Sequence, residues 1–295
     1  MLKVDGIINV LKPPGVTSHD IVSKVRRLAG QKKVGHGGTL DPGAAGVLPV
    51  FLGSATRLIE YAMEDAKAYR VEMTLGASSS TGDDSSSVEW TNVENYPTRE
   101  AVESVLNTFL GKTSQVPPMY SALKVEGKKL YELAREGKTV ERQPREIEIT
   151  SIELIDYQAP VALFDVECSK GTYIRTLCED IGKALEIPCL MTFLLRTRVG
   201  SFEVANSVIL EEGKDLSDSL LEPEWAVRSL EKIDLTEAGA LNFCSGQPVI
   251  LNLINPPKLF GVYNGKLFIG IGKLSQGVLK PEKVLVDVRK MDISR

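Results

Sequence analysis

The sequence predicts an α+β protein that ends in a small β-barrel-like region. Residues 67–75 alternate apolar and polar side chains, as in a strand with one buried face. Residues 18–29 instead place apolar side chains at helical spacing. From about residue 236 onward, short apolar runs alternate with glycines, which is typical of a small barrel.

The N-terminal elements are a short strand and a capped helix. Residues 6–11 form an apolar run that the segment Lys12-Pro13-Pro14-Gly15 ends. Gly30 can end a helix that Thr17 caps and whose apolar face consists of Ile21, Val22, Val25 and Leu28.

The next elements are less regular. Residues 47–52 fit either a strand or the start of a buried helix, and residues 54–63 are expected to be helical. Residues 77–95 are rich in Ser, Asp and Asn, which predicts a long loop. Thr98 then caps a helix with an apolar face of Val102, Val105, Leu106 and Phe109.

A basic arm is expected at about residues 112–146. Residues 115–124 are extended and interrupted by proline, and residues 128–135 form a short basic helix. With Met119 and Tyr120 in the extended part, this segment suits an arm that lies on a ligand.

Strands and one helix follow the arm. We expect strands at residues 147–154, with a register break at Thr150-Ser151, at 161–168 and at 190–199. In the last strand, strict alternation would place Met191 and Leu194 on opposite faces. Residues 174–185 form an amphipathic helix between the last two strands. The acidic stretch at 203–237 is expected to be a helical connection.

Length and charge indicate two domains and one candidate kind of partner. The chain of 295 residues allows one large and one small domain, which we place at 1–235 and 236–295. The net charge is −4, but positive charge gathers in three segments: residues 3–36, 112–146 and 239–295. Such a protein can bind nucleic acid on one face, although solvated surface is the favoured interpretation of each segment taken alone.

Cysteines and hydropathy favour a cytoplasmic protein. The four cysteines form no C-x-x-C pair, so neither a disulfide framework nor a zinc site is expected. The N-terminus lacks the features of a signal peptide, and Pro or Gly interrupts every apolar stretch before it reaches the length of a membrane span.

The main candidate for chemistry is Asp41, which lies in the glycine-rich stretch 34–50. Glycine allows close approach of backbone or ligand, and Pro42 favours an extended Asp41, so the stretch can hold a carboxylate rigidly. An ordinary Asp-Pro-Gly turn is the alternative, and spacing alone favours it. Motifs for a phosphate loop, a dinucleotide-binding loop and a serine nucleophile are absent from the sequence.

Three other side chains are candidate neighbours of Asp41. Arg175 falls in the first turn of its helix, where the helix dipole gives a cation no stabilisation, so a carboxylate or phosphate partner is expected. A surface Arg is the alternative. His36 and Tyr69 are the other two; Tyr69 begins a strand and points to its core face. A carboxylate paired with a guanidinium can stay ionised and act as a nucleophile without a metal.

Five motifs together resemble the bacterial tRNA pseudouridine synthase B (TruB) family. In family order they are Lys12-Pro13-Pro14-Gly15-Val16-Thr17-Ser18, the stretch 34–50 with Gly-His-Gly-Gly-Thr-Leu-Asp-Pro, Lys67-Ala68-Tyr69, the stretch 116–124 and the stretch 169–177. The C-terminal region resembles the PUA-type RNA-binding domain. The resemblance implies a mixed, mostly antiparallel pseudouridine-synthase sheet flanked by helices.

The resemblance also implies a reaction and site residues. Members isomerise a uridine in the T loop of tRNA (position 55 in tRNA numbering) to pseudouridine, without a cofactor or a metal. Asp41 matches the nucleophile, Tyr69 stacks on the flipped uracil and helps to remove its C5 proton, and Arg175 pairs with Asp41. The expected substrate-binding residues are His36, Tyr69, Tyr173, Leu194 and Lys12. The expected protein is a monomer with tRNA as its partner and no membrane.

The sequence departs from the family pattern at peripheral positions. These are Cys189-Leu190-Met191, Leu195 and the loop 79–86, which bear on RNA contacts and loop order. Two alternatives to the isomerase stay open: an RNA-binding or RNA-folding factor without turnover, and a hydrolase that uses Asp41. The hydrolase lacks a second carboxylate placed to act as an acid.

Overall fold

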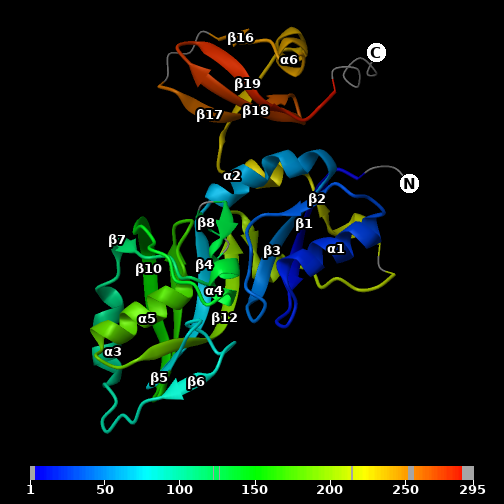
Figure 1. Ribbon diagram of the computed structural model, residues 1–295. Helices are drawn as coiled ribbons and strands as arrows, with labels where there is room; N and C mark the ends of the chain where they lie inside the picture. Colours follow the sequence, from blue (N-terminus) through cyan, green and yellow to red (C-terminus); the bar gives the residue numbers. More distant parts are fainter. Residues whose placement is uncertain (1–3, 122, 126, 214, 252–255, 288–295) are drawn as a thin grey trace.

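A large, mostly antiparallel sheet forms the body of the protein (Figure 1). The computed structural model describes residues 4–121, 123–125, 127–213, 215–251 and 256–287. The ten strands of this sheet run β14-β1-β3-β12-β4-β11-β10-β7, with β2 beside β3 and β13 beside β12. Only the β3–β12 pair is parallel among these paired strands.

The strands of the large sheet contain most of the expected ones. Their bounds are β1 Gly6–Lys12, β2 Val34–His36, β3 Ala45–Leu52, β4 Lys67–Leu75, β7 Gly111–Gln115, β10 Arg145–Gln158, β11 Val161–Cys168, β12 Cys189–Val199, β13 Phe202–Glu203 and β14 Leu220–Leu221. The run 47–52 is therefore a strand. The expected register break in β10 is confirmed, because its pairing with β11 shifts between Ile149 and Ser151.

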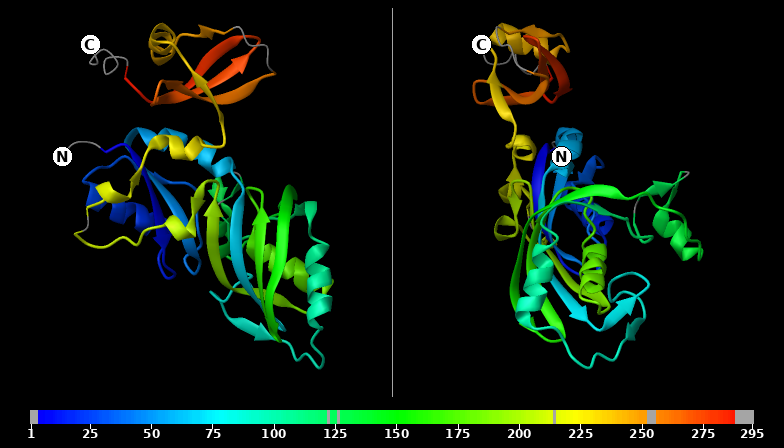
Figure 2. Two further views of the ribbon diagram at one scale, coloured as in Figure 1. Left: turned by 180° about the vertical axis from the view of Figure 1, so that it is seen from behind. Right: turned by 90° about the vertical axis from the view of Figure 1, so that its left-hand side faces the viewer.

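Helices cover the sheet in two places (Figures 1 and 2). Helix α1 (Ser18–Ala29) packs on β1 and β3, with Thr17 as its N-cap and Gly30 in the left-handed conformation at its end, as expected. Helices α3 (Arg99–Asn107) and α5 (Ile174–Ala184) pack on β4, β10 and β11. Residues 54–63 are helical, as η1 (Gly53–Leu58) followed by α2 (Ile59–Glu64).

The arm lies outside the sheet. It contains β8 (Lys124–Val125), β9 (Lys128–Lys129) and α4 (Leu130–Arg135), which project from the body in Figure 2. The arm leaves the sheet at the end of β7 and returns to it at the start of β10, so both of its ends are fixed by strand pairing.

A second, five-stranded sheet forms the C-terminal region. Its order is β15-β17-β18-β19-β16, and α6 (Glu237–Cys244) packs against it. The strands are β15 (Glu231–Asp234), β16 (Val249–Ile250), β17 (Lys258–Asn264), β18 (Leu267–Ser275) and β19 (Val278–Val284). This sheet lies above α2 in Figure 1, and Lys283 of β19 forms an ion pair with Glu60 of α2 at 2.6 Å.

An apolar cluster joins the two sheets. Buried Ile7, Phe51 and Phe202 of the large sheet share one cluster with buried Ile271 of β18. Arg57 of η1 also donates a hydrogen bond to the carbonyl oxygen of Val284. The C-terminal sheet is thus packed on the body through side chains.

Three sequence-based expectations were wrong in detail. The loop 77–95 contains a hairpin of β5 (Ala77–Ser79) and β6 (Val88–Trp90). The acidic stretch 203–237 is not a helical connection, because its described residues form the short 3-10 helices η2 (Val204–Asn206), η3 (Ser217–Ser219) and η4 (Pro223–Val227) and short strands. In β12, bulges interrupt strict alternation, so that Met191 and Leu194 share one buried face.

We expect Gly46 to be required where β3 meets β12. Its φ is +116°, and a Cβ atom there would lie 2.2 Å from the carbonyl oxygen of Arg196. Gly46→Ala should lower the free energy of unfolding by about 2–4 kcal/mol, measured by urea denaturation, because both backbone strain and overpacking oppose the side chain. Gly43→Ala is the control: nothing lies within 4 Å of its Cβ position. Equal stability of the two variants would contradict this account.

Candidate active site

Asp41 lies in the loop between β2 and β3. The loop is held by backbone hydrogen bonds, from Gly37 N to Pro49 O at 2.8 Å and from Gly15 N to Pro42 O at 2.9 Å. The side chain of Ser18 also bonds both backbone groups of Leu40. The Asp41 side chain is 40% exposed, so a fixed loop presents its carboxylate to an open edge.

A buried lysine ties down one side of this loop. Lys12 is 0% exposed, and its ammonium donates to the carbonyl oxygens of Pro13, Pro42 and Ala44 at 2.9, 3.2 and 2.6 Å. An ammonium has three donors, and all three are used. The structure therefore leaves Lys12 no surface for the RNA contact expected from the sequence; it fixes the backbone on both sides of Asp41 instead.

A buried arginine ties down the other side. Arg196 of β12 is 1% exposed and donates to the carbonyl oxygens of Gly38, Thr39 and Val47 at 3.1, 3.3 and 2.8 Å. It also lies opposite Tyr69 in the register of β12 and β4, and its charge lowers the Tyr69 pKa against the larger effect of burial. Arg196 thus connects the Asp41 loop to the tyrosine on β4.

Arg175 meets Asp41, as the sequence predicted. Its Nη2 atom lies 3.0 Å from Oδ2 of Asp41, and its side chain is only 7% exposed. The ion pair is formed through one nitrogen and is not bidentate. The other donors bond Thr81 O at 3.1 Å and Tyr120 O at 2.9 Å, so one guanidinium spans three segments of the chain.

A second carboxylate, Asp83, shares this guanidinium. Its Oδ2 atom lies 3.8 Å from Nε of Arg175, and its side chain is 13% exposed. Its Oδ1 atom accepts hydrogen bonds from Thr81 Oγ1 at 2.7 Å and from the backbone N of Ser85 at 3.1 Å. The loop 79–86 is therefore ordered around Asp83 in this structure.

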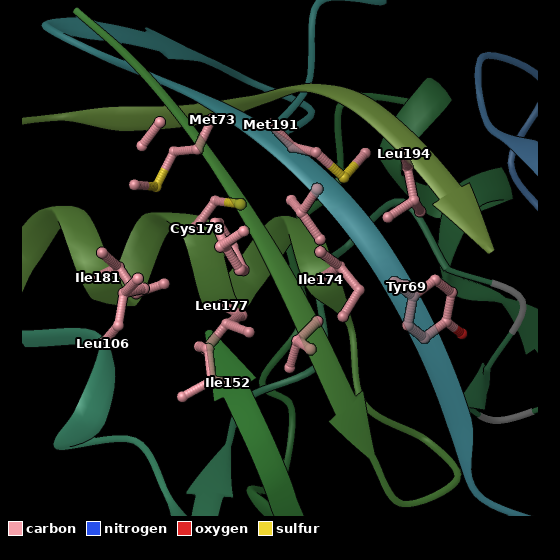
Figure 3. Close-up of a cluster of buried hydrophobic side chains, with 14 of the residues drawn as sticks. Tyr69, Met73, Leu106, Ile152, Ile174, Leu177, Cys178, Ile181, Met191 and Leu194 are labelled. Atoms are coloured by element: carbon pink, nitrogen blue, oxygen red, sulfur yellow. The ribbon is translucent and has the colours of Figure 1, made fainter. Parts of the chain in front are cut away.

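Tyr69 lies at the edge of the main apolar cluster (Figure 3). It is 8% exposed and shares this cluster with Leu194, which is 7% exposed, and with Leu40 beside Asp41. Figure 3 shows the Tyr69 hydroxyl directed away from the apolar side chains. The ring and Leu194 thus form an apolar wall next to the Asp41 loop.

His36 and Tyr173 are the other expected pocket residues. His36 is half-buried on β2, burial beside Arg196 lowers its pKa, and its Nδ1 atom has no hydrogen-bond partner among the described residues. Tyr173 precedes α5; burial raises its pKa, and its charged neighbours include Arg175 and Asp41.

Opposing effects set the charge state of the site. Burial raises the pKa of the Asp41 carboxyl, Arg175 and Lys12 lower it, and Asp83 raises it further, with a net shift upward. Burial also lowers the pKa of Lys12 to about 8 and raises the pKa of Tyr69 to about 12. Tyr69 is therefore a neutral phenol at pH 7.

Asp83 and Arg196 were not among the site residues expected from the sequence. Arg196 contacts residues about 150 positions away in the chain, and no local pattern reports such contacts. Its one local signal is a charge inside a strand of apolar residues. In the described part of the chain, no three His, Cys, Asp or Glu side chains gather as metal ligands would, and no helix is long and apolar enough to cross a membrane.

Family models match nearly the whole chain. The N-terminal domain of TruB family pseudouridylate synthases matches residues 26–174, and the tRNA pseudouridylate synthase B C-terminal domain matches residues 175–230. A C-terminal model of pseudouridine synthase II TruB matches residues 232–285.

Curated relatives agree with these models. The chain is 46% identical over 290 residues to tRNA pseudouridine synthase B of Caldanaerobacter subterraneus subsp. tengcongensis, covering 96% of this chain and 100% of the relative. It is 44% identical over 297 residues to the protein of that name from Clostridium perfringens, with coverage of 96% and 100%.

Solved structures share the fold. A chain in the crystal structure of a Cbf5-Nop10-Gar1 complex superimposes with a TM-score of 0.77 at 26% identity, covering 97% of this chain and 86% of that chain. A chain in an H/ACA RNP bound to a substrate RNA containing 2′-deoxyuridine gives 0.75 at 24% identity, with coverage of 96% and 86%. With the family models and the relatives, these likenesses show that the chain belongs to the TruB family of pseudouridylate synthases.

Proposed function

We propose that this protein isomerises uridine 55 in the T loop of tRNA to pseudouridine, with Asp41 as the nucleophile. The observation that carries the proposal is the Asp41 carboxylate, held by Arg175 at 3.0 Å and open to solvent on one side. The names of the curated relatives support tRNA as the substrate.

The reaction rearranges bonds within one nucleotide. The N1–C1′ glycosidic bond breaks, the uracil turns, and a C5–C1′ bond forms. C5 then loses its proton and N1 gains one, so no net proton is taken up or released. Asp41 attacks either C1′ of the ribose or C6 of the uracil, and is released when the new bond is complete. Since product and substrate are isomers, the balance requires no cofactor.

Tyr69 and Leu194 hold the base in this proposal. A base in a stacked loop must be flipped out, which costs a few kcal/mol. Stacking on an aromatic ring, worth about 1–3 kcal/mol per base, offsets that cost. Because the phenol of Tyr69 is neutral at pH 7, stacking is the role its environment favours, and acting as the base for the C5 proton would require the phenolate that burial opposes.

The arm and the C-terminal sheet are the proposed RNA contacts beyond the pocket. Lys128, Arg135 and Lys138 are exposed on the arm. We keep the division into a catalytic part to about residue 235 and a PUA-type part after it, with β15 at the junction. A monomer that acts on tRNA in the cytoplasm is the corresponding prediction.

A non-catalytic RNA-binding or tRNA-folding factor is the alternative. Incubating the protein with a tRNA transcript and determining pseudouridine at each uridine distinguishes the two. Pseudouridine at position 55 alone supports the proposal, whereas tight binding without any pseudouridine supports the alternative.

Asp41→Asn tests the nucleophile. The amide keeps the shape of the side chain and cannot attack, so pseudouridine formation should fall by more than about 10³-fold, while tRNA binding survives. Single-turnover assays and filter binding measure the two quantities. Asp165→Asn, an exposed carboxylate paired with Arg70, is the control. Normal turnover by Asp41→Asn would exclude the mechanism.

Arg175→Lys tests the guanidinium. An ammonium cannot reach Asp41, Thr81 O and Tyr120 O together, so the rate should fall by about 10²–10³-fold. Arg70→Lys is the matched control, since Arg70 bonds Asp165 through two nitrogens at 2.8 Å on the surface. Equal rates for the two variants would show that the geometry around Arg175 does not matter.

Salt dependence tests the arm. If exposed lysines contact phosphates, tRNA affinity should fall linearly on a log–log plot against salt, and Lys128→Ala should reduce the slope by about 1. Lys183→Ala, an exposed residue of α5 that pairs with Asp180, should leave the slope unchanged. Affinity that is insensitive to salt would contradict phosphate contacts by the arm.

A further inference from the structure

Gln115 is a buried polar side chain at the point where the arm leaves the sheet. It is the last residue of β7 and is 4% exposed. Its Nε2 atom donates to the carbonyl oxygen of Tyr173 at 3.1 Å, and its Oε1 atom accepts from the backbone N of Tyr173 at 2.8 Å. One amide thus satisfies both backbone groups of one residue, as a neighbouring strand would.

These two hydrogen bonds hold Tyr173, the residue that precedes the helix containing Arg175. Tyr173 is the N-cap of α5 and makes no side-chain cap bond, so the start of the helix is set by its backbone. Arg175 follows two residues later. The position of Gln115 therefore determines where the first turn of α5 begins relative to β7.

A second contact from the same segment reaches Arg175 directly. The carbonyl oxygen of Tyr120 accepts from Nη2 of Arg175 at 2.9 Å, the nitrogen that also lies 3.0 Å from Oδ2 of Asp41. Arg142, at the returning end of the arm, donates to the carbonyl oxygen of Pro117 at 3.1 Å. Residues 115–120 thus form the start of the arm and also contact Arg175 through the carbonyl of Tyr120.

We propose that Gln115 is a positioning residue for the isomerisation: its amide fixes the Tyr173 backbone and thereby places the Arg175 guanidinium between Asp41 and Tyr120. Among the hydrogen bonds of the described residues, the Gln115 side chain bonds the Tyr173 backbone and neither Asp41 nor the guanidinium. Through it, the arm and the catalytic pair keep one relative position. This inference rests on the proposed function.

The two bonds allow a sharp choice of substitutions. Gln115→Glu keeps an acceptor for the Tyr173 N–H but places a carboxylate oxygen against the Tyr173 carbonyl, where no donor remains. Gln115→Leu has similar size and removes both bonds, which leaves two buried backbone groups unpaired. Gln158→Glu is the matched control, because it makes the same Gln-to-Glu substitution at the exposed last residue of β10.

The experiment compares these variants and the wild type in single-turnover pseudouridine formation at saturating enzyme, with tRNA affinity and melting temperature measured in parallel. We expect the rate constant of both Gln115 variants to fall by about 10- to 100-fold, because a small misplacement of a positioned group has that effect. Affinity should change by less than about threefold, since phosphate contacts dominate it. Gln158→Glu should match the wild type.

A pH profile separates positioning from general damage. Arg175 lowers the pKa of Asp41, against burial and Asp83, with Lys12 as the other nearby cation. If Arg175 moves away, the Asp41 pKa rises, so the acid limb of the rate should move to higher pH in the Gln115 variants. A role in folding alone would scale the rate equally at every pH.

The outcomes are distinct. A lower rate with an acid limb at higher pH and retained affinity supports the inference. Wild-type rates in both variants overturn it, as does a rate loss that is uniform across pH or that parallels lost affinity or folding. An inactive wild type would instead contradict the proposed function. If Gln115→Leu fails to fold, Gln115→Glu, which keeps one bond, carries the same test.

Discussion

The 3.0 Å contact between Arg175 and Asp41 is the interaction on which the rest of the site depends. A carboxylate that is to attack carbon must be charged and aimed, yet partial burial opposes its charge. The structure meets this requirement with a guanidinium that cannot turn, because Thr81 O and Tyr120 O hold its other donors. The hairpin loop, the arm and the sheet therefore converge on one side chain.

Two buried cations, Lys12 and Arg196, hold the backbone of the Asp41 loop in place. Lys12 and Arg196 are buried, and their described hydrogen bonds go to backbone carbonyl oxygens. Burying an ion costs several kcal/mol unless its donors are satisfied, which the carbonyls of the Asp41 loop do. The charges of Arg175 and Lys12 lower the pKa of Asp41, but burial and Asp83 outweigh them, so the pKa is still raised.

Local chemistry predicted much of the fold and of the site. Alternation placed Tyr69 on the core face of its strand, and the unfavourable end of a helix dipole indicated a carboxylate or phosphate partner for Arg175. The choice of Asp41 as that partner came from the family resemblance. Lys12 was expected to contact RNA, but it is buried, because a loop 30 residues away closes over it, which its motif does not show. The register break in β10 had a local pattern, whereas the bulges of β12 and the partners of Gln115 and Arg196 depend on tertiary pairing.

The apolar cluster shared by the two sheets has a consequence for how the protein can be dissected. Ile271 of the C-terminal sheet is fully buried in contact with the cluster that contains Ile7 and Phe51 of the large sheet. Removing the C-terminal sheet would expose that surface to water and would weaken the core beneath β1, which ends at Lys12, and β3, which follows the Asp41 loop. Activity lost on truncation would therefore report a loosened catalytic framework as well as missing RNA contacts, and point substitutions on the outer face of the C-terminal sheet are the cleaner way to separate the two.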